Sequence, residues 1–135
     1  MFVLGIDPGL SRCGYGVLEQ SGRKAEAVAI GVIRTPAKAP LPQRLASIHQ
    51  ELSGLVEEHR PDVVAIERVF FQMNARTAMG VAQVSGLAMA IGNIAGAEVF
   101  EYTPNQVKEA VAGWGSANKE QMQRMVQSLL ALPER

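Results

Sequence analysis

The sequence has almost no cysteine and no net charge. Its single cysteine, Cys13, cannot form a bridge within the chain and offers no thiol cluster for a metal, so we expect a reducing, cytoplasmic location. The 13 basic residues equal the 13 acidic ones, a balance untypical of nucleic-acid-binding domains, which are usually basic overall. The first ten residues lack a basic region and carry Asp7 inside an apolar run, so we expect that they are not a signal peptide.

Apolar residues, in contrast, are plentiful enough to fold one domain. They make up 47% of the 135 residues, which argues against disorder. A chain of this length buries roughly two thirds of its unfolded surface, enough for one core without disulfides or structural zinc. We therefore expect a single domain over residues 1–135.

The hydrophobic pattern predicts five strands and four helices. The expected strands cover residues 2–7, 14–19, 25–34, 62–67 and 99–102, and the expected helices cover 41–60, 74–95, 103–113 and 118–130. The first three strands are expected to pair antiparallel, and the helical crossovers to place the last two parallel to the first. This order predicts an α/β fold with a mixed five-stranded sheet and helices on both faces.

The helix predicted over residues 74–95 carries no charge from Thr77 through Ala97, as a membrane span would. Polar side chains such as Gln83 and Asn93 dilute the segment, and no basic cluster flanks it to set a topology. We therefore favour a buried helix and no membrane contact. Its small residues would permit close approach of another element or of a symmetry mate.

Two carboxylates follow short apolar strands in the same way. Asp7 ends the first predicted strand and Glu67 ends the fourth, and sites in such sheets form beyond the carboxyl ends of parallel strands. Two carboxylates brought together repel each other and usually need a cation. Their oxygens suit a hard ion such as Mg²⁺ or Mn²⁺. The alternative is that each carboxylate caps a helix or faces solvent.

The segment around Asp7, residues 5–16, reads G-I-D-P-G-L-S-R-C-G-Y-G. Its glycines let backbone approach a phosphate closely, and a hairpin here would present its amides and Ser11 beside the metal. At this point the sequence resembles the RuvC family of Holliday junction resolvases, which have a ribonuclease H-like fold. Further motifs that carry the resemblance are G-Y-G-V over 14–17, A-I-E-R-V-F over 65–70, V-K-E-A-V over 107–111 and G-S-A-N-K over 115–119.

The resemblance implies a homodimeric crossover junction endodeoxyribonuclease that makes paired nicks across four-way DNA junctions in recombination and repair. It implies Asp7 and Glu67 as catalytic ligands, and two Mg²⁺ ions per active site in the complete protein, with Mn²⁺ as the other possible ion. It further implies Phe70 near the junction's bases, Lys108 at the DNA, and Lys119 as a catalytic residue at the scissile phosphate. The RuvA–RuvB branch-migration complex is the implied protein partner.

The chain departs from the family pattern after residue 131. The family continues past a Leu-Pro segment into a helix bearing D-A-x-D-A, the other two acidic ligands, whereas this sequence stops at Leu132-Pro133-Glu134-Arg135. Glu134 does not match that motif. We expect either a domain that lacks its C-terminal catalytic helix or a catalytically incomplete junction-binding module.

Two other function classes share short motifs with this sequence. D-x-G-x-S-x-x-G also resembles the first phosphate-binding hairpin of actin and the sugar kinases, but those proteins need two such domains with the nucleotide between them. The S-x-x-K at residues 116–119 matches acyl-transfer enzymes, yet neither S-D-N nor K-T-G accompanies it. A junction clamp without catalysis stays open, and it predicts binding unaffected by magnesium.

The zero net charge is a sum of unlike segments. Residues 40–62 hold two arginines and four acids, a balance of 2 − 4 = −2, whereas residues 68–97 hold Arg68 and Arg76 and no acid. We expect the first long helix to turn its acidic side away from DNA. The segment after Glu67, including Arg76, is expected to face the DNA.

Overall fold

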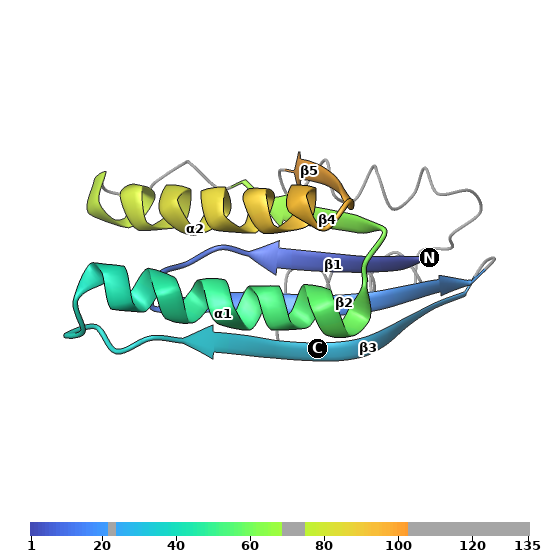
Figure 1. Cartoon of the computed structure of the whole chain (residues 1–135), viewed down its shortest axis with the longest axis horizontal. Coiled ribbons are helices and arrows are strands. Elements are labelled where there is room, and N and C mark those ends of the chain that lie inside the picture. Colours follow the sequence, from blue (N-terminus) through green and yellow to red (C-terminus); the bar gives the residue numbers. More distant parts are fainter. Residues whose placement is uncertain (22–23, 69–74, 103–135) are drawn as a thin grey trace.

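The computed structural model describes residues 1–21, 24–68 and 75–102, without the side chains of residues 24, 25 and 76. One sheet lies against two long helices (Figure 1). In chain order, the elements are β1 Phe2–Asp7, β2 Arg12–Ser21, β3 Lys24–Arg34, α1 Leu41–His59, β4 Val63–Glu67, α2 Ala75–Ile94 and β5 Glu98–Tyr102.

The sheet has the strand order β3-β2-β1-β4-β5. Its first three strands pair antiparallel, and β4 and β5 run parallel to β1, as predicted. The β2–β3 hairpin is longer than expected: Arg12 pairs with Arg34 and Ser21 with Lys24. Polar residues occupy both ends of this hairpin, so the hydrophobic pattern did not mark them as strand.

The helices α1 and α2 contact each other and lie on the same face of the sheet (Figure 1). The prediction of helices on both faces is therefore confirmed for one face. The described residues do not test it for the other face. The further helices expected at 103–113 and 118–130 lie outside the described residues.

The core lies between this helix pair and the sheet. Leu4, Ile6, Val64 and Ile66 of the central strands are almost fully buried there. They pack with Ile48, Leu52 and Val56 of α1 and with Val84, Ala88 and Ile91 of α2. Burial of these side chains is the main stabilising contribution, at about 25 cal/mol per Å² of apolar surface removed from water.

Helix α2 contains a stretch, Thr77–Ile94, that is long and apolar enough to cross a membrane. One side of it belongs to the core just described, as the buried helix predicted above requires. Gly92 shows why small residues are needed on that side: a Cβ there would come within 3.0 Å of Val64 and Val99 side chains. Close helix–sheet contact therefore explains part of the glycine content.

Side-chain alternation divides the sheet residues between two faces. Since Leu4 and Ile6 point toward the helices, Val3, Gly5 and Asp7 point toward the opposite face. The parallel register Val3↔Val63 to Ile6↔Ile66 gives β4 the same division. Glu67 therefore shares the second face of the sheet with Asp7.

Candidate active site

Asp7 and Glu67 lie at the carboxyl ends of adjacent central strands, β1 and β4. The register pairs Ile6 with Ile66, so the two acids occupy neighbouring positions immediately after the last registered pair. Glu67 is only 8% exposed and Asp7 is half-buried. The alternative of a solvent-facing carboxylate is therefore wrong for Glu67.

The two carboxyl groups share a hydrogen bond. Burial raises the pKa of Asp7, and the hydrogen bond with Glu67 opposes part of this rise. Burial, the charge of Asp7 and their hydrogen bond together raise the pKa of Glu67 to about 7. Below about pH 7 the shared proton is therefore held on Glu67, and Asp7 accepts the hydrogen bond.

The chemistry of this pair fits a divalent cation. Neither acid forms an ion pair with a basic side chain in the described part of the chain. Loss of the shared proton leaves two adjacent carboxylates, the oxygen donors that Mg²⁺ and Mn²⁺ prefer. No third His, Cys, Asp or Glu joins them among residues 1–21, 24–68 and 75–102. Cys13 is nearby, but burial raises the pKa of its thiol to about 11, so it stays protonated.

Three hydrogen bonds fix the turn after Asp7. Arg44, in the first turn of α1, donates two of them, and Thr35 donates the third. Arg44 Nη2 donates to Ser11 Oγ over 2.8 Å, and Arg44 Nε donates to Thr35 Oγ1 over 2.9 Å. The buried Thr35 hydroxyl donates in turn to the Leu10 carbonyl. Leu10 also packs beside Gly80 of α2, where a Cβ would lie 3.2 Å from the Leu10 Cβ. Both helices therefore hold the turn next to the acid pair.

Glycines surround Asp7 on its face of the sheet. Asp7 pairs with Gly14, and Gly5 pairs with Gly16 on β2 and with Ala65 on β4. The strand residues next to the acid pair thus contribute almost no side-chain volume. Gly9 serves a different purpose in the turn itself, because a Cβ there would clash with the Arg12 carbonyl oxygen.

The other predicted site residues have different outcomes. The structure places Ser11 in the turn, where its hydroxyl accepts the Arg44 hydrogen bond. Arg76 is the second residue of α2, which begins at this end of the sheet, and its side chain is not described. Phe70, Lys108 and Lys119 lie outside the described residues. Their roles, and the catalytic roles of Asp7 and Glu67, stay predictions.

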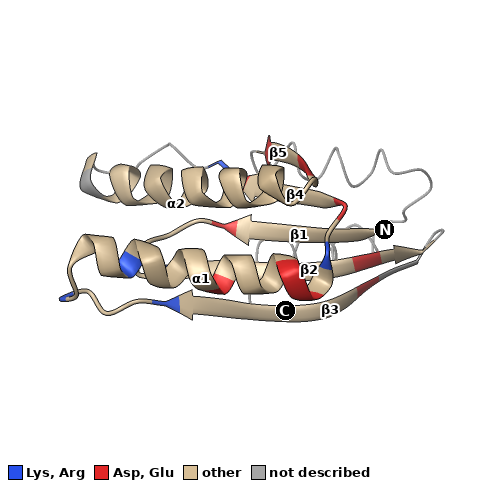
Figure 2. Cartoon of the chain, viewed as in Figure 1, with Lys and Arg blue, Asp and Glu red and all other residues tan. Residues whose placement is uncertain are grey.

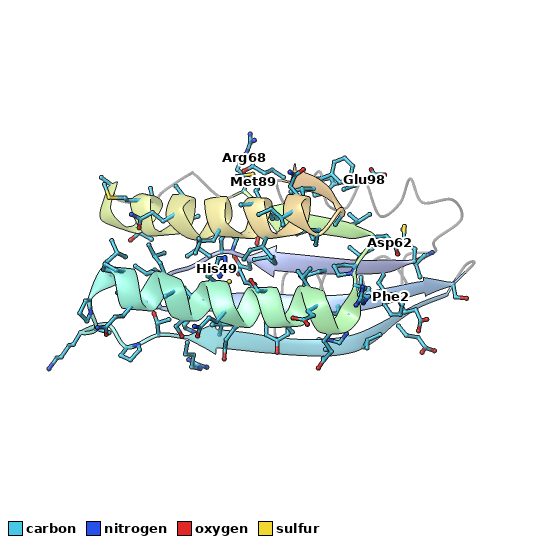
Figure 3. All side chains as sticks on the ribbon, in the orientation of Figure 1. Phe2, His49, Asp62, Arg68, Met89 and Glu98 are labelled. Atoms are coloured by element: carbon cyan, nitrogen blue, oxygen red, sulfur yellow. The ribbon has the colours of Figure 1, made fainter. Side chains whose placement is uncertain are left out.

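Arg68 corrects one expectation about charge. The prediction set Arg68 in an unopposed basic segment that faces DNA, but its Nη2 donates to Glu101 Oε1 over 2.9 Å. By alternation from Glu67, Arg68 points toward the helix-covered face, and Figure 3 shows it beside α2. The pairing was missed because Glu101 lies on the neighbouring parallel strand β5, far away in the sequence.

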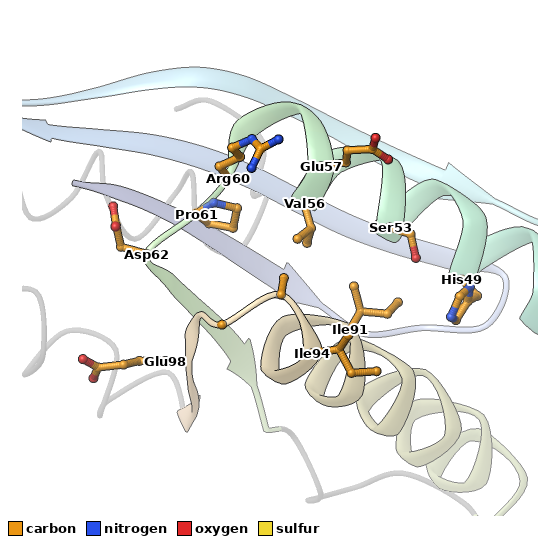
Figure 4. Close-up of a pocket in the computed structure, with 12 residues that line it drawn as sticks. His49, Ser53, Val56, Glu57, Arg60, Pro61, Asp62, Ile91, Ile94 and Glu98 are labelled. Carbon is orange, nitrogen blue, oxygen red and sulfur yellow. The ribbon is translucent and has the colours of Figure 1, made fainter.

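A hollow of about 830 Å³ lies at the opposite end of the molecule, between the C-terminal parts of α1 and α2. His49, Ser53, Ile91 and Ile94 line it from the two helices, as Figure 4 shows. Neither Asp7 nor Glu67 is among its lining residues. The hollow and the acid pair are therefore separate features, and only the acid pair offers metal-ligand chemistry.

Comparisons with known proteins agree with this architecture. Residues 3–135 match the family model described as crossover junction endodeoxyribonuclease RuvC. The chain is 46% identical over 132 residues to the RuvC of Natranaerobius thermophilus, and the match covers 98% of this chain and 82% of that protein. It is 54% identical over 135 residues to the RuvC of Salinispora arenicola, with 99% and 77% covered.

The solved structures add the fold. The Thermus thermophilus RuvC structure has a TM-score of 0.77 and 36% identity, and the match covers 99% of this chain and 82% of that one. The yeast mitochondrial resolvase Ydc2, at 18% identity and a TM-score of 0.62, shares the fold. The chain therefore belongs to the RuvC family of crossover junction endodeoxyribonucleases.

Proposed function

We propose that this protein resolves four-way DNA junctions by metal-dependent hydrolysis of phosphodiester bonds. The observation that carries the proposal is the buried Asp7–Glu67 pair, which shares one proton and ends two adjacent parallel strands. A Thermus thermophilus relative, 36% identical, has been solved in complex with a Holliday junction substrate, which supports the choice of DNA.

Asp7 and Glu67 are the residues that would hold the cation. A bound Mg²⁺ ion supplies an activated water and stabilises the departing oxygen of the phosphodiester. The protein's own part is to hold both carboxyl groups on rigid strand ends, with the Glu67 proton released to solvent when a cation binds, and to fix the adjacent turn through Arg44. Lys119 would offset charge on the phosphate, as the family resemblance implies.

Cleavage of a synthetic mobile four-way junction tests this proposal directly. Labelled junction is incubated with the 135-residue chain in Mg²⁺, in Mn²⁺ and in EDTA, and symmetric nicks in opposite strands are mapped. We expect nicks with either metal and none in EDTA. Cleavage that persists in EDTA would contradict the metal role, and unpaired nicks spread along linear duplexes would contradict junction resolution.

A second candidate is a junction-binding module that does not cut. It is favoured by the donor set, since the described residues supply two carboxylates and no further ligand. This candidate predicts junction binding that is the same with and without Mg²⁺, and no nicking with any metal. The cleavage assay, run beside a gel-shift measurement of binding to the same labelled junction with and without Mg²⁺, separates the two candidates.

The protein is further proposed to act as a homodimer, since a twofold junction calls for two identical sites. The outer side of α2 exposes Met79, Ala82, Gly86 and Ala90. A Cβ at Gly86 would meet nothing within 4 Å, so packing among the described residues does not explain this glycine. Glycine in a helix interior costs about 1 kcal/mol relative to alanine, a cost that close approach of a second α2 would offset.

Gly54 of α1 provides a matched control for this interface, because a Cβ there also meets nothing within 4 Å. We expect Gly86→Leu to shift the protein toward monomer in sedimentation experiments at micromolar concentration, and Gly54→Leu to leave the assembly unchanged. Equal assembly of both variants would exclude this side of α2 as the interface. By family resemblance the RuvA–RuvB complex remains the expected protein partner.

A further inference from the structure

Two arginines oppose each other on the same face of the sheet as the acid pair. Arg12 begins β2 and Arg34 ends β3, and the antiparallel register pairs them directly. Gly14 is the β2 partner of Asp7, and Arg12 stands two residues beyond Gly14, so alternation places Arg12 on the face that carries Asp7. Its cross-strand partner Arg34 lies on the same face.

The distances follow from sheet geometry. With a spacing of about 4.8 Å between strands and a rise of about 3.4 Å per residue, the Arg12 Cα lies about 8 Å from the Asp7 Cα. The Arg34 Cα lies about 12 Å away on the same basis. Both guanidinium groups are therefore within roughly a Debye length or two of the acid pair. They flank the site on its β2–β3 side.

Neither arginine has an acidic partner in the described part of the chain. Both are exposed, and the ion pairs found among residues 1–21, 24–68 and 75–102 involve other side chains. Like charges directly opposite on neighbouring strands destabilise a sheet. The Arg12–Arg34 pair therefore does not stabilise the fold. Its position beside the acid pair points to a negatively charged ligand.

The charges along the β2–β3 hairpin are polarised. Arg12 and Arg34 face each other at the end beside Asp7, on the face that carries Asp7, whereas Glu19 and Glu26 face each other near the other end and on the helix-covered face. Figure 2 shows the same division, with basic residues at the end of β3, in the loop after it and in the first turn of α1. A polyanion that reaches Asp7 would therefore meet positive charge on the β2–β3 side of the acid pair, and neither glutamate shares that face.

We propose that Arg12 and Arg34 bind backbone phosphates of the DNA strand that flanks the cleaved phosphate. This inference rests on the proposed junction-cutting function, because it takes the phosphate at Asp7 and Glu67 as its starting point. Successive phosphates of one strand then continue over β2 and β3. Two guanidinium groups on adjacent strands can each donate two hydrogen bonds to a phosphate. The contacts read no base, so they hold the strand in place without choosing its sequence.

Salt-dependent junction binding tests the inference. Fluorescence anisotropy with a labelled four-way junction, in buffer without divalent cations, gives Kd at several salt concentrations for the whole 135-residue chain. We expect Arg12→Gln and Arg34→Gln each to lower the slope of log Kd against log salt by about one, and to weaken binding about five-fold at physiological salt. The double variant should lower this slope by about two.

Three controls make the result specific. Arg60→Gln removes the same charge at the far end of α1 and should leave the slope unchanged. Arg12→Lys keeps the positive charge and should keep the slope. The thermal midpoint of Arg34→Gln should equal or exceed that of the parent, because a repulsive pair is removed, so weaker DNA binding would not come from unfolding.

The possible outcomes distinguish failure of the arginine–phosphate contacts from failure of the proposed junction-cutting function. A parent that binds junctions while the double variant binds them with an unchanged slope would overturn this inference alone, and would assign the pair to another acidic ligand such as a protein. A parent that binds no junction DNA would overturn the proposed function and the inference with it.

Discussion

At the carboxyl ends of β1 and β4, the half-buried Asp7 and the buried Glu67 face each other, and neither forms an ion pair with a basic side chain among the described residues. At the other end of β4, Asp62 precedes the strand and its carboxylate accepts a hydrogen bond from the Phe2 amide over 2.9 Å. Figure 3 shows Asp62 and Phe2 close together at that end. Asp62, at one end of β4, therefore connects β4 to β1, whereas Glu67, at the other end, remains available for a ligand.

The hollow between the helices belongs to the Asp62 end of the molecule. It is large, and Glu57, Arg60, Asp62 and Glu98 lie around it. These charged groups have mixed signs, and Asp62 already has a hydrogen-bond partner. Size therefore does not identify the functional end of this sheet, whereas an uncompensated pair of carboxyl groups does.

The largest expected effect comes from removing either member of the acid pair. We expect Asp7→Asn and Glu67→Gln to lower the rate of junction cleavage about a thousandfold or more, because the metal would lose a ligand and its transition-state stabilisation. Single-turnover cleavage in Mg²⁺ measures the loss, and anisotropy should show largely intact junction binding. Asp62→Asn is the matched control at the other end of β4. Parental cleavage rates in either acid-pair variant would show that the chemistry lies elsewhere.

The next effect is on stability and its dependence on pH. The raised pKa of Glu67, about 7 against an ordinary 4.5, means that the folded state holds a proton that the unfolded state releases. Without metal, stability should therefore fall as pH rises from about 4.5 to about 7 and then level off, by an amount on the order of 3 kcal/mol. Thermal unfolding in EDTA across this range measures the slope.

Glu67→Gln sharpens that test because the amide does not titrate. The variant should lose most of the slope between pH 4.5 and pH 7, and it should be more stable than the parent at pH 8 in EDTA. Added Mg²⁺ should raise the thermal midpoint of the parent at pH 8 more than at pH 5, since the ion competes with the shared proton. An identical slope in parent and variant would exclude Glu67 as its source.

A smaller effect separates the two ends of α1. Arg44, in its first turn, holds the turn after Asp7 through Ser11 and Thr35, whereas Arg60 at its last turn stands at the other end of the sheet. We expect Arg44→Ala to slow cleavage about ten-fold, because the turn beside the acid pair loses two charge-assisted hydrogen bonds. The Mg²⁺ concentration for half-maximal cleavage should rise as well. Arg60→Ala should change neither quantity. Equal effects of the two substitutions would mean that Arg44 contributes only to general stability.

The acid pair and the fold could be predicted from the sequence because both depend on local patterns. Each acid directly follows a short apolar strand, and the strand–helix order limits the sheet to few topologies. Both strands are buried continuously, so it is the alternation of side chains along parallel strands, and not a burial pattern, that puts both acids on one face. These features need no knowledge of which distant residues meet.

The basic side of the site could not be predicted, because it depends on register and on side-chain contacts. Arg12 meets Arg34 only through the exact pairing of β2 with β3, which includes an irregularity between Val17 and Leu18. The ion pair of Arg68 was not predicted because its partner Glu101 is on β5, far away in the sequence. A one-residue change in strand register moves a side chain to the other face, so charge counts along the chain cannot assign these residues.

The smallest expected effect returns to Asp62. Asp62→Asn keeps an oxygen that can accept from the Phe2 amide but loses the charge, so the free energy of unfolding should fall by about 0.5 to 1 kcal/mol. Chemical denaturation measures this change, and the cleavage rate should stay at the parental value, because Asp62 precedes β4 whereas Glu67 ends it. Asp62→Ala leaves the amide without its partner and should cost more stability, again without slowing cleavage. A cleavage rate that fell in both variants while stability held would mean that the strand carries the chemistry at both its ends, and the contrast between them would fail.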